Sequence, residues 1–116
     1  MIFGVCTFPT DQGIGPASLA RELESRGFDS LWVTEHTPVP AMRRTPAPEG
    51  GQLGRKADRL LDPFLALTAA ATATRRLLLD TGVDLAVQRD PSSPRREAAT
   101  LDLLSQSRFR YGAGIG

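Results

Sequence analysis

The hydrophobic positions of the chain follow two alternating patterns, which predict strands and helices in turn. Short apolar runs of the kind that form buried strands occur at residues 2–8, 30–34, 77–83 and 108–113. Between them, apolar residues recur at helical spacing, and the expected helices cover residues 16–26, 63–74 and 94–104. Strands that are apolar on both faces and alternate with helices are typical of a parallel sheet. The sequence therefore predicts an α/β fold of parallel βα units, with four strands and three helices.

Local residue signals set the expected ends of the helices. Pro16 suits the first position of the first helix, and Gly27 suits its C-terminal cap. Asp62 before Pro63 is typical of a helix start, where the carboxylate accepts a hydrogen bond from the first turn. We expect Pro94 to delay the start of the third helix, because proline cannot donate the backbone hydrogen bond that a helix interior requires.

The same pattern predicts which side chains are buried. Cys6 lies inside the first apolar run and Trp32 inside the second, so both are expected to be core residues. On the third helix, Ala98, Leu101 and Leu104 fall on one face and are expected to point inward.

Residues 37–60 form the longest break between the expected elements. They contain four prolines, three glycines and five Lys or Arg residues against two acidic residues. A segment of this length inside a compact domain is either a functional loop or disordered. We expect it to be a loop at the carboxyl end of the second strand.

Composition narrows the class of protein. The 116 residues carry a formal net charge of +1, which gives no electrostatic attraction for nucleic acid or an anionic membrane surface. Cys6 is the single cysteine, so an internal disulfide is excluded. The N-terminus lacks the features of a signal peptide, and no apolar run reaches the roughly 20 residues that span a bilayer. We therefore expect one cytoplasmic domain over residues 1–116, without nucleic-acid or membrane partners.

Polar residues and glycines concentrate where the predicted strands end. In parallel α/β folds, closed or open, ligands bind beyond the carboxyl ends of the strands. In this chain those positions are residues 7–12, 35–37, 81–84 and 112–116. The pattern predicts a site for a small-molecule substrate at that edge of the sheet.

His36, the only histidine, directly follows the second strand and lies beside Glu35. An imidazole at this position could exchange a proton with a substrate near neutral pH, and a neighbouring carboxylate could raise its pKa. Neighbouring residues of a strand point to opposite faces, so the two side chains are not expected to touch. The alternative is a solvated loop histidine, and the residues alone leave both open.

Other chemistries have weaker support in the residues. Gly13-x-Gly15 after the first strand is similar to part of a dinucleotide-binding loop, but Ser18 stands where the third glycine is needed. Residues 112–116 also alternate glycines, without a following helix whose N-terminus could hold a phosphate. One histidine and one cysteine, without a spaced carboxylate cluster, predict no metal site.

Several ordered motifs resemble the bacterial luciferase-like monooxygenases, and most closely their branch that depends on the deazaflavin coenzyme F-420. In chain order the motifs are residues 27–37 (GFDSLWVTEHT), 61–64 (LDPF), 81–83 (TGV), 88–91 (QRDP), 99–105 (ATLDLLS) and 108–109 (RF). They cover essentially the whole chain. The resemblance implies an oxidoreductase that performs hydride transfer or monooxygenation on a small organic substrate, with coenzyme F-420 as the expected cofactor and FMN as the alternative.

The resemblance also implies roles for individual residues. Glu35 and His36 match a catalytic acidic–histidine pair near the redox ring, in which the histidine takes a proton from the substrate. The implied cofactor-binding residues are Thr81, Gly82, Val83, Gly112 and Gly114. In several members of the family the bond that corresponds to Gly82–Val83 is a cis peptide.

The chain departs from the family pattern in residues and in length. Asp80 replaces a usual glycine and Asp84 a small or apolar residue, so two carboxylates need partners or an open, wet site. Gln106 replaces a usual turn glycine. Because a TIM-type (β/α)8 barrel needs about 250 residues, we expect its N-terminal half. The alternative function is a truncated, non-catalytic fragment, or a half-barrel that associates with a second copy or a complementing C-terminal half.

Overall fold

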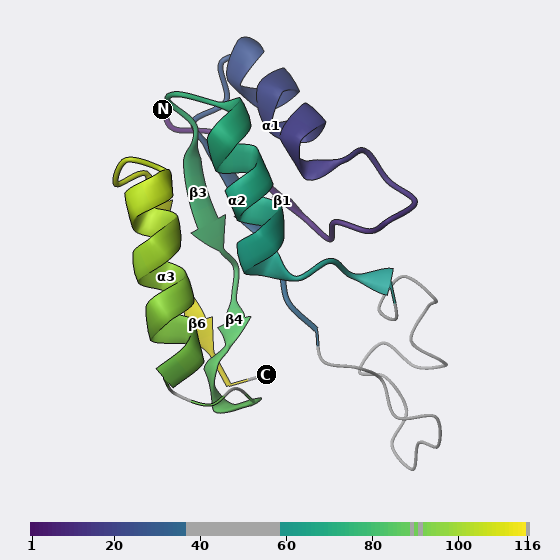
Figure 1. The fold of residues 1–116 in the computed structure, drawn as a ribbon. Helices are drawn as coiled ribbons and strands as arrows, with labels where there is room; N and C mark the ends of the chain where they lie inside the picture. Colours follow the sequence, from purple (N-terminus) through teal and green to yellow (C-terminus); the bar gives the residue numbers. More distant parts are fainter. Residues whose placement is uncertain (37–58, 89, 91, 116) are drawn as a thin grey trace.

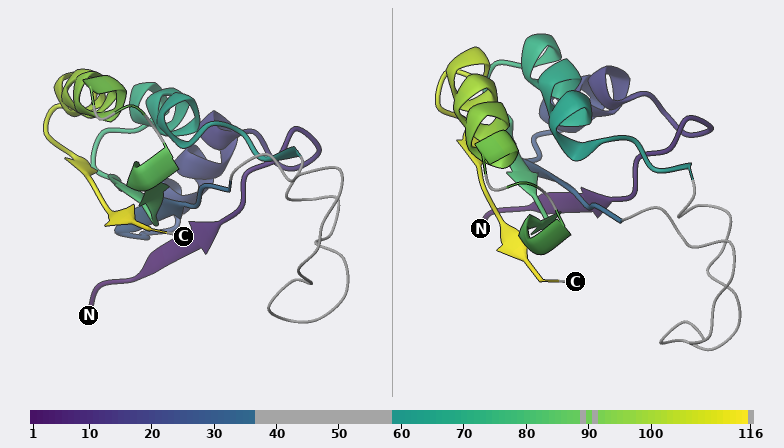
Figure 2. Two further views of the ribbon diagram at one scale, coloured as in Figure 1. Left: turned by 90° about the horizontal axis from the view of Figure 1, so that it is seen from below. Right: turned by 60° about the horizontal axis from the view of Figure 1, so that its bottom comes forward.

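The computed structural model describes residues 1–36, 59–88, 90 and 92–115. The loop expected at residues 37–60 lies outside the described residues, except for its last two positions. Within the described part, a parallel sheet in the order β1-β2-β3-β5 is covered on one face by three α-helices (Figures 1 and 2). The predicted fold class, parallel βα units with four strands and three helices, is confirmed.

The elements alternate along the chain as predicted. The strands of the main sheet are β1 (Gly4–Thr7), β2 (Ser30–Val33), β3 (Leu78–Thr81) and β5 (Phe109–Arg110). The helices are α1 (Pro16–Ser25), α2 (Pro63–Ala73) and α3 (Ser92–Leu104). A second, two-stranded pair joins β4 (Asp84–Leu85) to β6 (Ala113–Gly114), and the short 3-10 helix η2 (Ala86–Gln88) follows β4.

The expected strand at residues 77–83 ends at Thr81, and the separate strand β4 begins at Asp84; the expected strand at 108–113 is interrupted after Arg110, and β6 begins at Ala113. The reason lies in the side chain of Thr81. Its hydroxyl donates a hydrogen bond to the carbonyl of Gly112 at 2.9 Å and accepts one from the Gly112 N–H at 2.8 Å. The Thr81 hydroxyl thus replaces the backbone groups that would otherwise pair with Gly112. Backbone pairing between the two chain segments resumes where the Asp84 N–H donates to Gly112 O at 2.8 Å.

The register of the parallel strands separates two faces of the sheet. Alternate side chains of a strand point to opposite faces. The row that faces the helices consists of Val5, Leu31, Leu79 and Phe109. Leu31 and Leu79 are completely buried, and they form the core together with Leu67 of α2 and Leu101 of α3. The apolar core therefore lies between the sheet and the three helices.

The opposite, open face carries a second row, formed by Cys6, Trp32, Asp80 and Arg110. In the described part of the chain no helix covers this face (Figure 2). The expectation that Cys6 and Trp32 are core residues is wrong: Cys6 is exposed, and Trp32 retains 36% of its accessible surface. The first strand is also shorter than expected and lies at the edge of the sheet, and none of its four residues is buried. Alternation along each strand, together with helices on one face only, accounts for these corrections.

The predicted starts of α1 and α2 are confirmed. Pro16 is the first residue of α1, and Gly27 beyond its end adopts φ +81°, which glycine accommodates without steric cost. Asp62 caps α2, because its Oδ1 accepts a hydrogen bond of 3.0 Å from the Leu65 N–H.

Helix α3 begins at Ser92, earlier than expected. Pro94 is accommodated in the first turn, where its missing N–H would have no intrahelical partner. The carboxylate of Asp90 accepts a hydrogen bond of 2.8 Å from the Ser92 N–H at this end of the helix. The inward face is confirmed for Leu101, whereas Leu104 is 50% exposed and its expected burial is wrong.

Two charged side chains join the elements at the end of the sheet where β2 and β3 begin. Glu24 of α1 accepts hydrogen bonds from three successive backbone N–H groups ahead of β3, the last from Leu77 at 2.8 Å. The Arg108 guanidinium donates to Ala71 O, Thr74 O, Leu77 O and Ser105 O and to the Thr74 hydroxyl, at 2.7–3.1 Å. These bonds fix the last turn of α2 against the start of β5.

Candidate functional site

The predicted site residues converge where the strands end, with β3 and β4 at the centre. The peptide bond between Gly82 and Val83, which links these two strands, is cis. The Gly82 N–H donates to the Val33 carbonyl of β2 at 2.8 Å, so the bend is attached to the neighbouring strand. Val83 then points outward, with 40% of its surface exposed. The cis bond that the resemblance implies is therefore present in the structure.

Gly112 and Gly114 approach this bend from the last strands. A Cβ atom on Gly112 would lie 2.3 Å from the Thr81 carbonyl oxygen, and one on Gly114 would lie 2.4 Å from Val83 Cγ2. The Gly112 clash is with backbone, so only glycine fits there, whereas a side chain at position 114 would require the Val83 side chain to shift. The expected close backbone approach at Gly112 and Gly114 is present, and in this structure the two glycines approach Thr81 and Val83 of the same chain.

Glu35 reaches the same place from the end of β2. Its Oε2 accepts a hydrogen bond of 2.7 Å from the backbone N–H of Leu85 in β4. Glu35 and His36 are both half-buried at the point where the chain leaves the sheet. The structure therefore brings Glu35, Thr81, Gly82, Val83, Gly112 and Gly114 together, with His36 next to Glu35 in the chain.

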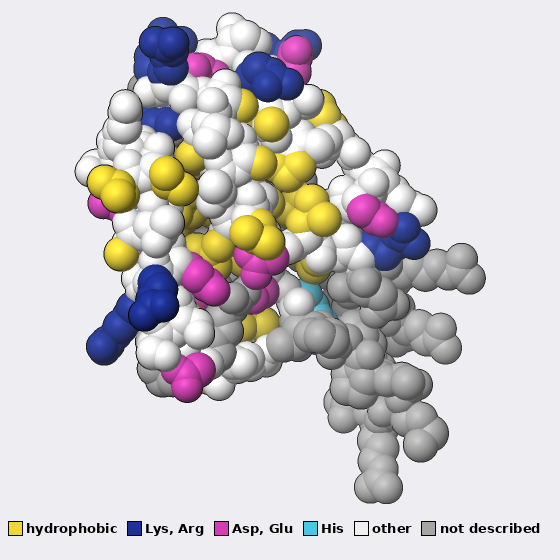
Figure 3. All heavy atoms as spheres, viewed as in Figure 1, with side chains coloured by type: hydrophobic (Ala, Val, Ile, Leu, Met, Phe, Trp, Pro, Cys, Tyr) yellow, Lys and Arg dark blue, Asp and Glu magenta, His cyan; other side chains and the backbone are white. Residues whose placement is uncertain are grey.

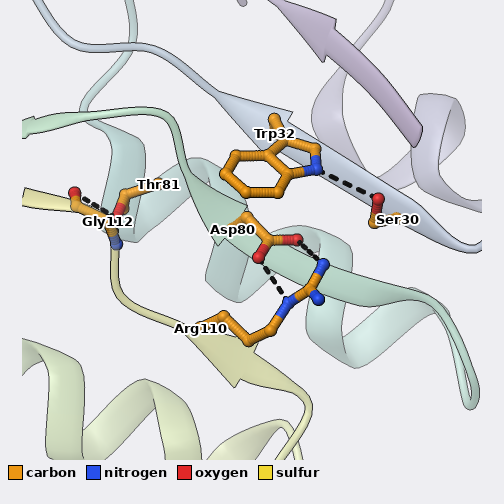
Figure 4. A network of polar contacts seen from close by, with 6 residues as sticks. All are labelled: Ser30, Trp32, Asp80, Thr81, Arg110 and Gly112. Atoms are coloured by element: carbon orange, nitrogen blue, oxygen red, sulfur yellow. Dashed lines mark hydrogen bonds and ion pairs between the residues drawn. The ribbon is translucent and has the colours of Figure 1, made fainter.

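The two unusual carboxylates have partners. Asp80, which is 1% exposed, accepts a hydrogen bond of 2.8 Å from Arg110 Nη2, and Arg110 Nε lies 2.5 Å from its Oδ1 (Figure 4). This hydrogen bond with Asp80 raises the pKa of Arg110, which stays charged at any working pH. Asp84, which is completely buried, accepts a hydrogen bond of 2.5 Å from the Tyr111 hydroxyl. The expected need for partners is thus met inside the chain.

Trp32 lies on the open face, next to Asp80 in the row across the strands. Its Nε1 donates a hydrogen bond of 3.0 Å to the Ser30 hydroxyl, and the Arg110 guanidinium carbon lies 5.5 Å from its ring centre (Figure 4). This is within the range of a cation–π contact. Sequence reasoning missed Trp32 and Arg110 as site residues. The alternation of the second and fourth strands, which places Trp32 and Arg110 opposite the core-facing Leu31 and Phe109, was the available signal.

The family model described as luciferase-like monooxygenase matches residues 15–116. The chain belongs to the luciferase-like monooxygenase family. It is 41% identical over 119 residues to an uncharacterized protein of Mycobacterium tuberculosis; this match covers all of the chain and 42% of that relative. It is 26% identical over 116 residues to the 5,10-methylenetetrahydromethanopterin reductase of Methanolobus tindarius, of which it spans 29%.

Solved structures of luciferase-like fold resemble the chain over nearly its whole length. The coenzyme F-420-dependent tetrahydromethanopterin reductase of Methanopyrus kandleri superimposes with a TM-score of 0.71 at 25% identity, over 99% of this chain and 27% of that one. The oxygenating constituent of 3,6-diketocamphane monooxygenase of Pseudomonas putida, in complex with FMN, gives a TM-score of 0.76 at 18% identity, over 100% and 30%. The chain thus spans well under half the length of these relatives.

The charge of this luciferase-like site is mainly acidic in the described residues. Glu35, Asp80 and Asp84 lie near the strand ends, while Arg110 is paired with Asp80. Figure 3 shows acidic side chains on several parts of this face, including its lower part, where basic side chains lie beside them. Among the described residues no cluster of three or more His, Cys, Asp or Glu could hold a metal ion, and no helix is long and apolar enough to span a membrane.

A cavity of about 420 Å³ lies elsewhere, at the opposite end of the strands. Ile2, Glu24, Phe28, Asp29 and Arg76 are among its lining residues, and they precede or flank the starts of β1, β2 and β3. In parallel α/β folds ligands bind at the carboxyl ends of the strands. We therefore assign the site to the cis bend and not to this cavity.

Proposed function

We propose that the chain forms the ring-binding side of a deazaflavin or flavin site in an oxidoreductase of luciferase-like type that acts on a small organic substrate. The observation that carries the proposal is the joining of three strand ends at one bend: Glu35 binds Leu85, Gly112 packs on Thr81, and Gly114 packs on Val83. Membership of the family and likeness to the F-420-dependent reductase support the reaction class.

Val83 is the residue proposed to meet the ring. It is an exposed apolar side chain on a bend with several backbone attachments, so a planar group could lie on it without displacing protein atoms. Thr81, Gly82, Gly112 and Gly114 would hold that surface in place through the contacts described above. When bound, a deazaflavin or flavin supplies the capacity to exchange a hydride with the substrate or, for a flavin, to react with oxygen.

His36 is proposed to accept the substrate proton at its imidazole nitrogen as the substrate is oxidised. An imidazole nitrogen can accept and release a proton, which suits this role. Glu35 would act beside it by fixing the exit of β2 through Leu85. We therefore propose that His36 transfers the proton and that Glu35 positions the end of β2.

Coenzyme F-420 is proposed as the cofactor, with FMN as the alternative. The reductase of Methanolobus tindarius and the F-420-dependent reductase of Methanopyrus kandleri support the deazaflavin. The FMN-bound monooxygenase is 18% identical and supports the fold alone. Arg110 on the open face is paired with Asp80, so we expect the cofactor phosphates to be held by other residues.

Anaerobic titration of the chain with coenzyme F-420, FMN and riboflavin tests the proposal. We expect the riboflavin and FMN affinities to agree within about threefold, because the described residues meet the ring and not the phosphate. Addition of the C-terminal remainder of the Mycobacterium tuberculosis relative should strengthen binding of the phosphorylated cofactors. In that mixture, a His36→Gln variant should bind the cofactors as the unaltered chain does, but it should no longer oxidise substrate. Absence of binding with and without the added segment contradicts the proposal.

The open face of the sheet and the edge strand β1 favour a second property, association with another polypeptide. An unpaired strand edge offers backbone groups for pairing with a further strand. The partner is proposed to be either a second copy or a complementing C-terminal half. Sedimentation of the chain alone and with the added segment separates the two, and a monomer in both cases contradicts them.

A further inference from the structure

We propose that Trp32, Asp80 and Arg110 are positioning residues that seat the Gly82–Val83 peptide from the open face of the sheet. The three side chains occupy one row across β2, β3 and β5. The support that these side chains give to the Gly82–Val83 peptide does not depend on a bound ligand. Its consequence for cofactor binding rests on the proposed function, because the seated peptide is the one assigned to the ring.

The first part of the device is the ion pair between Asp80 and Arg110. Asp80 is the next-to-last residue of β3, and Arg110 is the last residue of β5. The two-point contact between the carboxylate and the guanidinium therefore fixes β3 and β5 relative to each other just before the bend. A carboxylate that is 1% exposed is rarely retained for stability alone, because its desolvation offsets much of the attraction.

The second part is the indole of Trp32, which fills the space beneath Gly82. A Cβ atom built on Gly82 would lie 3.0 Å from Trp32 Cε3 and 3.5 Å from Trp32 Cβ. The indole is held on its other side by the Ser30 hydroxyl and by the Arg110 guanidinium. Movement of Arg110 would therefore move the surface on which Gly82 rests.

The path from the ion pair to the bend is short and continuous. Arg110 is bound by Asp80 and lies over Trp32, and Trp32 contacts the backbone of Gly82. Val83, the exposed residue assigned to the ring, is the next residue in the chain. Small changes in the row are thus expected to alter the orientation of Val83 and leave the helix-side core intact, since none of the three belongs to that core.

The experiment compares Asp80→Asn, Arg110→Lys and Trp32→Leu with Arg26→Lys, a matched control in an exposed pair with Glu22. Amide hydrogen exchange of Gly82 and Asp84 is measured in the ligand-free chain. We expect exchange at both amides to increase about 3- to 10-fold in the three variants and to stay unchanged in the control. Trp32→Phe, which keeps an aromatic ring, should recover part of the protection. Exchange no faster than in the control overturns the proposal, whether or not a ligand binds.

The second measurement is the induced circular dichroism of bound FMN and coenzyme F-420, together with their affinities. We expect weaker binding, by about 3- to 10-fold, and an altered induced signal, which loss of global stability alone would not produce. Unaltered signals and affinities despite faster exchange overturn the positioning role toward the ring. If the unaltered chain binds neither cofactor while the variants exchange faster, the seating is supported and the proposed function is contradicted.

Discussion

The carboxylate of Glu35 accepts a hydrogen bond of 2.7 Å from the backbone N–H of Leu85 and thereby ties the end of β2 to β4. We predict that Glu35→Ala destabilises the chain by about 1–3 kcal/mol, the usual cost of an unsatisfied or lost charge-assisted bond. Glu35→Gln retains an acceptor oxygen and should lose less than half of that. Urea unfolding of the variants measures both, and equal losses contradict the positioning role.

Glu24 gives a pH-dependent prediction. Burial acts to raise the pKa of its carboxyl, but the hydrogen bonds from Arg76, Leu77 and Arg75 outweigh burial and hold the pKa below the ordinary value of 4.5. A carboxyl with a lowered folded-state pKa stabilises the fold above its unfolded pKa and loses that contribution as the pH falls through the lowered value. Glu24→Gln should therefore destabilise by about 1–3 kcal/mol at pH 7 and by much less near pH 3.

The free energy of unfolding measured at intervals from pH 7 to pH 3 tests this prediction. Glu22→Gln is the control, because Glu22 pairs with Arg26 at the exposed surface. The control should change stability by less than about 0.5 kcal/mol at any of these pH values. A constant difference between Glu24→Gln and the unaltered chain across the range would show that the carboxylate charge is irrelevant.

A substitution at Gly112 shows whether glycine is needed there for the fold or for cofactor binding. Gly112→Ala places a methyl group 2.3 Å from the Thr81 carbonyl, so we predict a loss of at least about 2 kcal/mol without any ligand. Gly13→Ala is the control, since its nearest contact would be an ordinary 3.6 Å. Thermal unfolding of the ligand-free variants is the measurement. Equal stability of the two variants would mean that the glycine serves the cofactor alone.

Gln106 has φ +57°, a left-handed conformation that is unfavourable for a residue with a side chain. Gln106→Gly should remove this strain and stabilise the chain by up to about 1 kcal/mol, after the greater freedom of glycine in the unfolded state is deducted. Gln88→Gly, in η2 and without a positive φ, should stabilise nothing. The denaturation midpoints of the two variants, measured side by side, decide the point.

The hydrogen bonds of Arg108 predict that replacement by lysine, which conserves the charge, lowers the stability of the fold considerably. Arg108→Lys keeps the charge but cannot reproduce donation to four carbonyls and the Thr74 hydroxyl from a planar fork. We expect a loss of about 2–3 kcal/mol in urea unfolding, because buried carbonyls at the end of α2 lose their partner. Arg26→Lys at the exposed surface should change stability by less than about 0.5 kcal/mol.

The sequence predicted the elements well where a signal was local. Pro16, Gly27 and the Asp62–Pro63 pair act within one turn of a helix, and each has the expected role in the structure. The start of α3 was misplaced because proline in a first turn costs nothing, and Asp90 provides a hydrogen bond outside the predicted helix. Local rules set helix ends, but a residue just outside the pattern shifts them.

The site could be predicted only in part. Glycines and polar residues at strand ends indicated the place, and the motif residues 81–83 indicated the bend. The partners of that bend depend on tertiary contacts: Trp32 was expected in the core because consecutive apolar residues in β2 conceal which of them faces the helices. The acceptor for the Leu85 N–H lies 50 residues away in Glu35, and no spacing rule reaches across that distance.

The position of Trp32 has a practical consequence. It is the single tryptophan of the chain, so all tryptophan emission comes from one side chain, and the indole lies against Gly82 at the cis bend. Tryptophan emission overlaps the absorption of flavins and deazaflavins, so a ring on Val83 would quench it by energy transfer over a few ångströms. Quenching of Trp32 fluorescence should therefore report binding of the cofactor at the proposed site, without an added label.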